Sequence, residues 1–411
     1  MRILTVGNSP YNNTSSSVVH ADLLKFLKDS EHDISAAVWH HVSSYYMFDE
    51  NEQYWFEDGE ERICELTILP AETSKVAVLY EHMKVFQPDV VISIGDYHEI
   101  DFIHAIKRMY PHLFKWLGIL TVSSFPIKQT YKESLDYLDY VFCTSEGGLE
   151  SLRSLTDVPC ECQHFYPQRE ILGSGELSDC FNVVACLKNS QQSNLGIFLI
   201  VAAGIGENNS NIKFYVHTNV DDDGDYDLDY MKDGFPENLV FPDKFVSFYD
   251  GIPQKELMQK FAEADVFVDC SMTAATGLSA FEAMSQACIP LLSDTGAHID
   301  LMNSISLSEH TSFYPYFKLE AIEFLGEREG ILNIVSQTEL YNKIIKAYKL
   351  WKESPLLCMK LKNNCQKRAK GLMSNKLVIE VEKMVRKVAA EGKLTLAVDS
   401  LKNKKDLAVV S

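Results

Sequence analysis

In the second half of the chain, a glycine turn is followed by a predicted helix that carries a glutamate, Glu282, in its first turns. Residues 271–277 are small and polar, so the backbone there can come close to a ligand. A helix is predicted to begin near Gly277, and its free N–H groups and positive dipole end would bind a diphosphate there, beside Leu278. Glu282 lies one turn into that helix, where its carboxylate would accept hydrogen bonds from a ribose diol. The pattern therefore predicts a nucleotide site.

Two apolar runs position this turn and its helix. Residues 265–270 and 288–292 are short and bounded by turn formers, as buried parallel strands are. A second glycine turn, residues 293–297, follows the second run. Ligands of open α/β sheets bind at the carboxyl ends of the strands, and both turns fall at that edge.

A second pair of candidate residues lies in the first half of the chain. Asp96 and His98 lie at the carboxyl end of its clearest predicted strand, residues 87–96. The carboxyl end of that strand would face the space between the two halves, so we expect Asp96 and His98 to be catalytic. A capping or turn role is the alternative for Asp96.

The stretch from residue 250 to residue 302 resembles the donor-site signature of retaining glycosyltransferases, specifically family 4 and its relatives. The residues that fall on the signature are Gly277-Leu278, Glu282-Ala283-Met284, Ser293-Asp294, Gly296 and Asp300. The family's first glutamate falls on Ala274 instead. The chain thus resembles a divergent member, of a type that also occurs in phage and viral genomes.

The resemblance implies an α/β fold in which two Rossmann-like domains face a central cleft, the GT-B fold. Residues 1–172 would form the acceptor domain, with an aromatic-rich insertion at about 40–70 that makes either a small core or a stacking surface for the acceptor. Residues 178–340 would form the nucleotide-sugar donor domain, after a linker at 170–177. Residues 341–411 would form helices that cross back to the first domain and a basic tail.

The resemblance also assigns donor contacts after the first strand of the second domain. Relatives carry the run Arg-Asn-x-x-Arg-Lys-Asn there, and its cations neutralise the donor diphosphate. This chain keeps Lys188, Asn189 and Asn194 at those positions, so they are predicted to bind the donor. Gln192 and Ser193 stand where two further cations are expected.

The predicted sugar pocket departs from the family at Ala274. In relatives, the glutamate at this position accepts hydrogen bonds from the donor sugar. Its replacement removes two acceptors and leaves room, which favours a pentose or a differently oriented hexose. The hydroxyl groups of Thr273 and Thr276 flank the position and would be the local substitutes.

The activity that the resemblance implies is sugar transfer with retention, from a nucleotide-sugar that we expect to be UDP-linked. The acceptor would be a saccharide, a small molecule or a modified DNA base. No metal is obligatory in the family, because the helix dipole and cations stabilise the leaving diphosphate, which itself helps to deprotonate the acceptor. Two alternatives stay open: a non-catalytic nucleotide- or sugar-binding module, which the lost family contacts favour, and a sugar-nucleotide epimerase, which Ala274 disfavours.

Charge is unevenly distributed over the 411 residues. The net charge is −20, but residues 341–411 hold seventeen Lys and Arg against six Asp and Glu, so residues 1–340 carry −31. Because residues 1–340 are so acidic, we do not expect the surface as a whole to bind phosphate backbones or anionic membranes. The simpler expectation for the basic segment is that it packs against the acidic body.

Hydropathy and cysteine usage predict a cytoplasmic protein. No apolar run is long enough to cross a bilayer, and Met1 leads directly into a strand with no signal peptide. The ten cysteines include no CxxC pair, and Cys143, Cys186, Cys270 and Cys288 lie inside apolar runs. Buried free thiols are typical of a reducing compartment.

Two segments resemble incomplete metal sites. Cys160, Cys162 and His164 alternate along a predicted strand and would share one face, but the segment offers no fourth zinc ligand. Residues 219–230 begin like a calcium loop, with Tyr230 where the final glutamate would stand. We therefore expect no metal site.

Overall fold

The computed structural model describes ten residue ranges of the chain. Several of the sequence-based predictions concern residues outside these ranges. These concern the start of the calcium-like loop, the first part of the aromatic insertion and the basic tail. The described ranges are residues 1–12, 14–39, 54–59, 61–70, 75–123, 125–218, 224–241, 252–306, 318–326 and 330–390.

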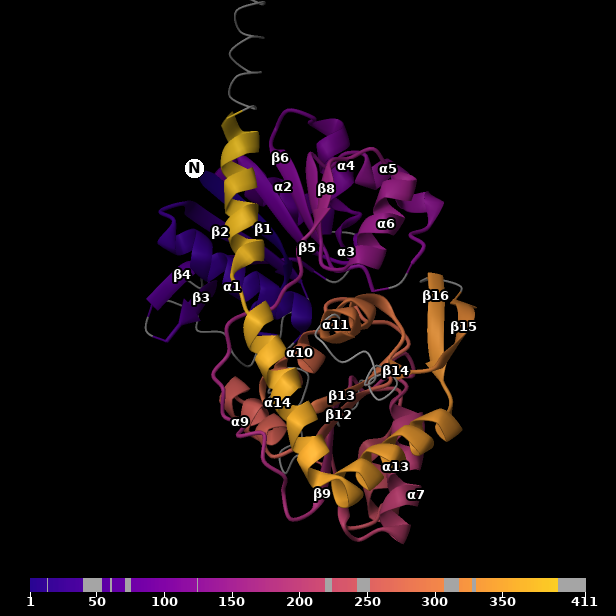
Figure 1. The fold of residues 1–411 in the computed structure, drawn as a ribbon. Helices are drawn as coiled ribbons and strands as arrows, with labels where there is room; N and C mark the ends of the chain where they lie inside the picture. Colours follow the sequence, from indigo (N-terminus) through magenta and orange to yellow (C-terminus); the bar gives the residue numbers. More distant parts are fainter. Residues whose placement is uncertain are drawn as a thin grey trace, which may run out of the picture.

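The first half of the described chain forms an eight-stranded sheet in the order β3-β4-β2-β1-β5-β6-β7-β8 (Figure 1). Its neighbouring strands are parallel, except that β3 and β4 form an antiparallel edge from the described part of the aromatic insertion. The strands are β1 (Arg2–Asn8), β2 (Asp33–Trp39), β3 (Tyr54–Asp58), β4 (Glu61–Ile68), β5 (Val90–Gly95), β6 (Lys115–Leu120), β7 (Tyr140–Cys143) and β8 (Cys160–Cys162).

The second half of the described chain forms a six-stranded parallel sheet in the order β11-β10-β9-β12-β13-β14. An antiparallel hairpin, β15 and β16, stands beside it (Figure 1). The strands are β9 (Phe181–Cys186), β10 (Ile212–His217), β11 (Leu239–Val240), β12 (Val266–Asp269), β13 (Ile289–Ser293), β14 (Lys318–Leu319), β15 (Ala321–Gly326) and β16 (Gly330–Val335).

Helices connect the parallel strands and cover the sheets. Those of the first half are α1 (Ser15–Asp29), α2 (Lys75–Phe86), α3 (Tyr97–Ile100), α4 (Ile103–Met109), α5 (Lys132–Leu135) and α6 (Glu146–Leu155). Those that follow are α7 (Leu195–Asn208), α8 (Leu228–Met231), α9 (Gln254–Ala262), α10 (Leu278–Ser285), α11 (Gly296–Ser306), α13 (Gln337–Glu353), α14 (Pro355–Leu372) and a helix over residues 376–390. This is the predicted α/β architecture of two Rossmann-like units.

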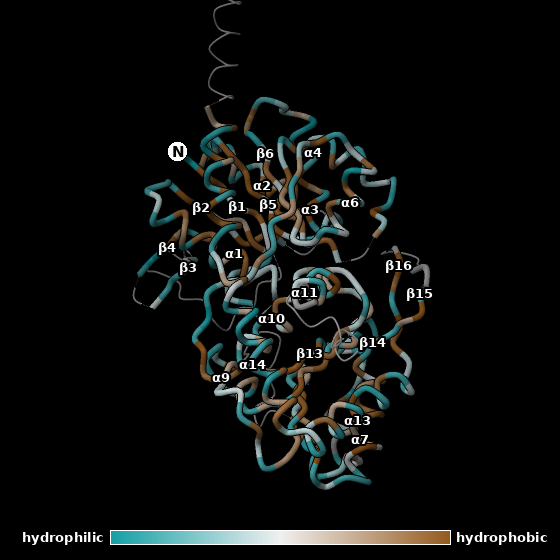
Figure 2. The backbone as a smooth tube through the Cα atoms, viewed as in Figure 1, coloured by the Kyte–Doolittle hydropathy of each residue, from teal (hydrophilic) through white to brown (hydrophobic). Residues whose placement is uncertain are grey.

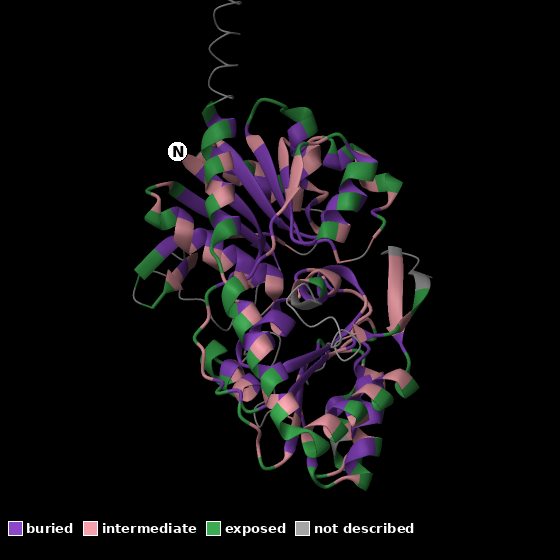
Figure 3. Ribbon diagram, viewed as in Figure 1, coloured by how far each residue is buried: buried purple, intermediate pink, exposed green. Residues whose placement is uncertain are grey.

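Alternate residues of the central strands bury their side chains on opposite faces of the first sheet. Along β1, Ile3 packs in the cluster that contains α1, whereas Leu4 and Val6 pack in the cluster that contains α2 and α4. Both faces are therefore covered, which explains why these strands are apolar along most of their length. Figure 2 shows the strands as brown segments, and Figure 3 shows them buried beneath helices whose outer faces are exposed.

The C-terminal helices cross back to the first half of the molecule, as predicted. After α14, the backbone N–H of Ser374 donates to the Tyr166 carbonyl at 2.8 Å. The helix over residues 376–390 then runs along the first half (Figure 1), where Glu382 Oε1 lies 3.3 Å from His32 Nε2. Val381 and Val385 of this helix are fully buried. The chain thus starts and finishes its described part on the same lobe.

The ten cysteines are all free, as predicted. Cys143, Cys270 and Cys288 are buried, and Cys186 is half-buried. Among the helices that the structure describes, none combines the length and the apolar character needed to cross a bilayer.

A buried ion pair fastens α14 to the second sheet. Lys362 Nζ lies 2.7 Å from Asp265 Oδ1 and also donates to the Ala264 carbonyl at 3.1 Å. Both charged side chains are almost completely shielded from solvent, at 3% and 0% exposure. A charge in such a place is stable only while its partner is present.

Lys362→Met keeps an apolar stem but leaves the Asp265 carboxylate buried without its cation. We expect the free energy of unfolding, measured by urea denaturation, to fall by about 3–5 kcal/mol. Lys360→Met, at an exposed position of the same helix, is the matched control and should change it by less than about 0.5 kcal/mol. Equal losses in the two variants would contradict this role of the ion pair.

Candidate functional site

The loops at the carboxyl ends of the two sheets meet. Thr144, directly after β7, donates its hydroxyl to the Ala275 carbonyl in the loop after β12, at 2.9 Å. The backbone N–H of Ile331, in β16, donates to the Phe125 carbonyl beyond β6 at 3.1 Å. The glycine turn predicted to bind a donor therefore lies at the boundary between the two lobes.

Backbone contacts fix the two glycine turns against each other. The Ala297 N–H donates to the Ala274 carbonyl at 2.9 Å, and Gly296 adopts a left-handed φ of +45°. A Cβ at Gly296 would lie 2.0 Å from the Ala274 carbonyl oxygen, so only glycine fits there. Met272 extends the network by donating its N–H to Gln192 and accepting from the N–H of Asn333. The loop after β12 is thus held from three sides.

The helix α10 begins at this fixed loop. Gly277 occupies its N-cap with a φ of +63° and offers no side chain to cap the first turn. The Thr276 hydroxyl accepts the Leu278 N–H at 3.3 Å. Both Thr276 and Leu278 are buried, whereas Thr273 is half-buried. The positive end of the α10 dipole therefore points at a loop of small residues beside the lobe boundary.

The predicted ribose ligand, Glu282, is buried in an ion pair that the sequence did not reveal. Arg169 Nε donates to Glu282 Oε1 at 2.7 Å, and Gln254 Nε2 donates to the same oxygen at 2.9 Å. Burial raises the pKa of Glu282, and Arg169 acts in the opposite direction, while Asp22 of α1 raises it further. Glu282 thus interacts with both lobes, and its carboxylate is held in place by Arg169, directly before the linker, and by Gln254 of α9.

The three predicted donor-binding residues of the loop after β9 lie in different surroundings. Lys188 is exposed at the end of the strand. The Asn189 amide donates to the Tyr226 carbonyl at 2.8 Å and accepts the Tyr226 N–H at 3.2 Å. Asn194 starts α7 in a left-handed conformation, with its amide 3.3 Å from the Val335 carbonyl. Both asparagine side chains therefore hold neighbouring backbone, and donor binding by this loop stays a prediction.

Asp96 has the capping geometry that the sequence left as an alternative to catalysis. Its Oδ1 accepts the Tyr97 N–H at 2.7 Å, and Glu99 completes a capping box at the start of α3. Its Oδ2 accepts both the N–H and the hydroxyl of Ser123, at 3.1 and 2.6 Å. The side chain of His98 is 45% exposed, with Nδ1 3.8 Å from Asp96 Oδ1. Catalysis by this pair stays a prediction, with His98 the more accessible group.

Sequence reasoning missed a buried histidine–aspartate pair at the carboxyl end of the second sheet. His298 of α11 lies with Nε2 3.3 Å from Asp269 Oδ2 and Nδ1 3.3 Å from the Ser293 hydroxyl. Burial alone would raise the pKa of Asp269, but His298 and Ser271 outweigh it and the pKa is lowered. The available signal was a histidine directly after the second glycine turn. The pair ties β12 to α11 beneath the candidate site.

The fold is shared with solved glycosyltransferases. Sucrose-phosphate synthase from Thermosynechococcus elongatus has a TM-score of 0.68 at 13% identity, with 95% of this chain and 100% of that chain covered. A trehalose-6-phosphate structure from E. coli, bound with UDP-2-fluoro glucose, has a TM-score of 0.61 at 13% identity, with 94% and 99% covered. The catalytic domain of starch synthase IV from Arabidopsis thaliana, bound to ADP and acarbose, has a TM-score of 0.58 at 11% identity, with 95% and 99% covered.

These structural similarities, together with the two facing sheets, establish the GT-B fold of the chain. No protein-family model matches the sequence, and no curated protein matches it. The function therefore has to be argued from the site itself.

The raised pKa of Glu282 predicts a pH dependence of stability with a defined sign. The folded state keeps the proton of this carboxyl to a higher pH than the unfolded chain does, so its contribution to stability falls as pH rises from about 4.3 towards the folded pKa. Glu282→Gln retains acceptors for Arg169 and Gln254 but cannot ionise. The free energy of unfolding of the wild type, relative to this variant, should therefore decrease with rising pH in urea titrations. An increase would contradict the assignment, and Glu256→Gln, at an exposed position of α9, is the matched control.

Proposed function

We propose that the protein is a retaining glycosyltransferase that moves a sugar from a nucleotide-sugar to an acceptor bound between the lobes. The observation that carries the proposal is the packing of the two glycine turns, at Ala274 and Gly296, where the carboxyl ends of the two sheets face each other. In open α/β folds this edge is where nucleotides bind. The stretch that resembles the donor-site signature of family 4 spans the same turns.

The donor would bind along α10. Glu282 would accept hydrogen bonds from the ribose, and Gly277, Leu278 and the start of the helix would bind the diphosphate. Lys188 is exposed at the neighbouring strand end and would add a positive charge. The helix dipole and this cation would stabilise the leaving diphosphate without a metal in the reaction.

We expect the donor to carry uridine and a sugar that fits a pocket altered at Ala274. The E. coli neighbour was solved with UDP-2-fluoro glucose, which supports a UDP-linked donor. Ala274 is buried at 8% exposure, so it offers only its methyl group where relatives carry a glutamate. Thr273, which is half-buried, and Thr276, whose oxygen already accepts the Leu278 N–H, are the nearest hydroxyl groups in the loop. We therefore expect a pentose or a differently oriented hexose to be accepted.

The acceptor would enter from the first lobe, where His98 is accessible. A saccharide or a small molecule fits the acidic character of residues 1–340 better than a modified DNA base, because that segment carries −31 and would repel a phosphate backbone. The ten free cysteines support a reducing compartment such as the cytoplasm.

A non-catalytic nucleotide-binding module is the second candidate, and one observation favours it. In the loop after β9, the Asn189 amide is bonded to Tyr226, and the Ser193 N–H donates to the Ser190 hydroxyl at 3.1 Å. Relatives use this loop to neutralise the diphosphate, whereas here hydroxyls and amides hold the loop itself. Such a site would bind a nucleotide but stabilise a leaving group weakly.

A panel of nucleotide-sugars separates the two candidates. The full chain is incubated with pentose and hexose donors on the same nucleotide, and free nucleoside diphosphate is measured by mass spectrometry. A transferase should release nucleoside diphosphate slowly by hydrolysis of the donor even without an acceptor. The hydrolysis rates should differ by about tenfold to a few hundredfold among the sugars. Measurable nucleotide binding with no release from any donor would favour the binding module.

Thr273→Val tests the sugar pocket within the same assay. Loss of the hydroxyl should change the ratio of pentose to hexose hydrolysis, because the substituted atom would contact the sugar. Thr338→Val, at an exposed position of α13, is the matched control and should leave the ratio unchanged. A strict hexose preference that survives Thr273→Val would show that the sugar is held elsewhere.

A further inference from the structure

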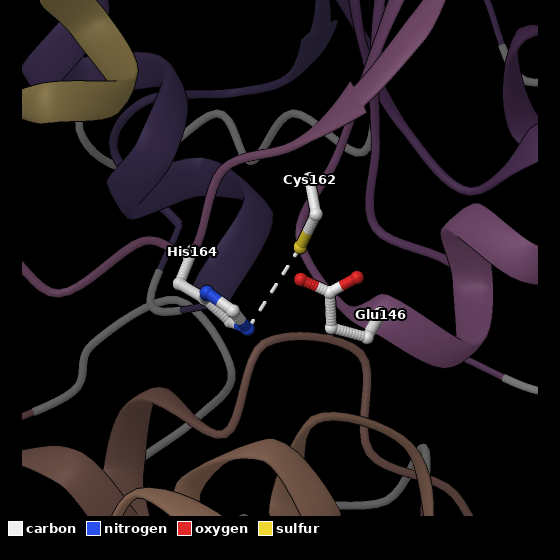
Figure 4. Close-up of side chains that lie close together, drawn as sticks. All are labelled: Glu146, Cys162 and His164. Carbon is white, nitrogen blue, oxygen red and sulfur yellow. Dashed lines mark hydrogen bonds between the residues drawn. The ribbon is translucent and has the colours of Figure 1, made fainter.

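Four side chains with metal-binding atoms converge where α11 meets the first lobe. Glu146 begins α6, Cys162 ends β8 and His164 follows two residues later, and their ligand atoms all lie within 4.8 Å of one another. Figure 4 shows the Glu146 carboxylate and the His164 ring directed toward the Cys162 sulfur. Asp300 of α11 reaches the same place from the second lobe, with Oδ2 3.2 Å from His164 Nε2. The sequence alone offered Cys160 in this role, but Cys160 is outside the cluster.

Two spacings between the ligand atoms are close to those around a tetrahedral zinc ion. With Zn–S of about 2.3 Å and Zn–N or Zn–O of about 2.0 Å, neighbouring ligand atoms stand about 3.3–3.5 Å apart. The Cys162 sulfur lies 3.8 Å from His164 Nε2, and His164 Nε2 lies 3.2 Å from Asp300 Oδ2. The ligand atoms of Glu146, Cys162 and His164 lie within 4.8 Å of one another, whereas Asp300 is outside that set. Asp300 therefore has to change its side-chain conformation to complete the coordination of one ion.

The chemistry of the four groups also fits zinc. One thiolate, one imidazole and two carboxylates are its usual ligand types, and hard cations such as Mg²⁺ would not select the sulfur. Asp300 already lies next to Glu146, because its Oδ2 accepts the Glu146 backbone N–H at 2.9 Å. The fourth ligand that residues 160–164 lack is thus supplied by residues far away in the sequence.

We infer that Glu146, Cys162, His164 and Asp300 form a zinc site that bridges the two lobes. On binding, the Cys162 thiol releases its proton to solvent and His164 binds as the neutral imidazole through Nε2. Three ligands come from the first lobe and one from α11, so the ion holds the lobes in the facing arrangement. The site does not depend on the proposed transferase activity, since the ion would be structural and four-coordinate.

The test is zinc and cobalt binding by the full chain, after treatment with a chelator. We expect one Zn²⁺ per chain by competition with a chromophoric chelator. Co²⁺ in the same site should show a thiolate-to-metal charge-transfer band in the near ultraviolet. Cys162→Ser should remove that band and weaken zinc binding on the order of 100-fold or more, since even outer partners of a metal site contribute about 10–100-fold.

Cys160→Ser is the matched control, because Cys160 lies two residues away on the same strand and outside the cluster. It should keep the band and the affinity. Asp300→Asn should retain the band, because the thiolate stays, but should weaken zinc binding at least tenfold. The absence of stoichiometric binding, or equal affinities and bands in the two cysteine variants, would overturn the proposal. Unchanged zinc affinity in Asp300→Asn would overturn the bridging role.

Discussion

The approach of the Ala274 carbonyl to Gly296 is the constraint on which the candidate site depends. Because a Cβ at Gly296 would lie 2.0 Å from that oxygen, the loop after β12 and the start of α11 can pack only through glycine. This contact fixes the start of α10 and places Ala275 within reach of Thr144 in the other lobe. The Ala274 side chain offers only a methyl group at the predicted sugar pocket.

The segment between the lobes is held by several hydrogen bonds to α10 and the residue that follows it. The Gln286 side chain accepts the Leu172 and Gly173 N–H groups and donates to the Glu170 carbonyl. Arg169, at the start of the same segment, pairs with Glu282. The linker is therefore packed against α10 and the residue that follows it, so the proposed nucleotide site and the connection between the lobes share one helix. Binding at α10 would be felt directly by the segment that joins the two halves.

Local sequence patterns predicted the elements well but not their long-range partners. The strands predicted at residues 265–270 and 288–292 are observed, to within one residue at each end, as β12 and β13, because periodicity and turn residues are properties of neighbouring positions. The partner of Glu282 lies 113 residues away at Arg169, and no local pattern signals it. Asp96 was placed correctly at a strand end, yet its bonds to Ser123 depend on how β5 and β6 pair. Asp300 matched the family pattern, but its contact with His164 appears only when the lobes are assembled.

We propose above all that a nucleotide binds along α10 through the Glu282 carboxylate. Calorimetric titration of UDP into the wild type and Glu282→Gln tests it most directly, with Glu256→Gln as the matched control. The loss of a charge-assisted hydrogen-bond pair should weaken binding by about 1–3 kcal/mol, or roughly 5–150-fold, in Glu282→Gln alone. Equal UDP affinity in all three proteins, with Glu282→Gln shown to be folded, would contradict nucleotide binding through Glu282.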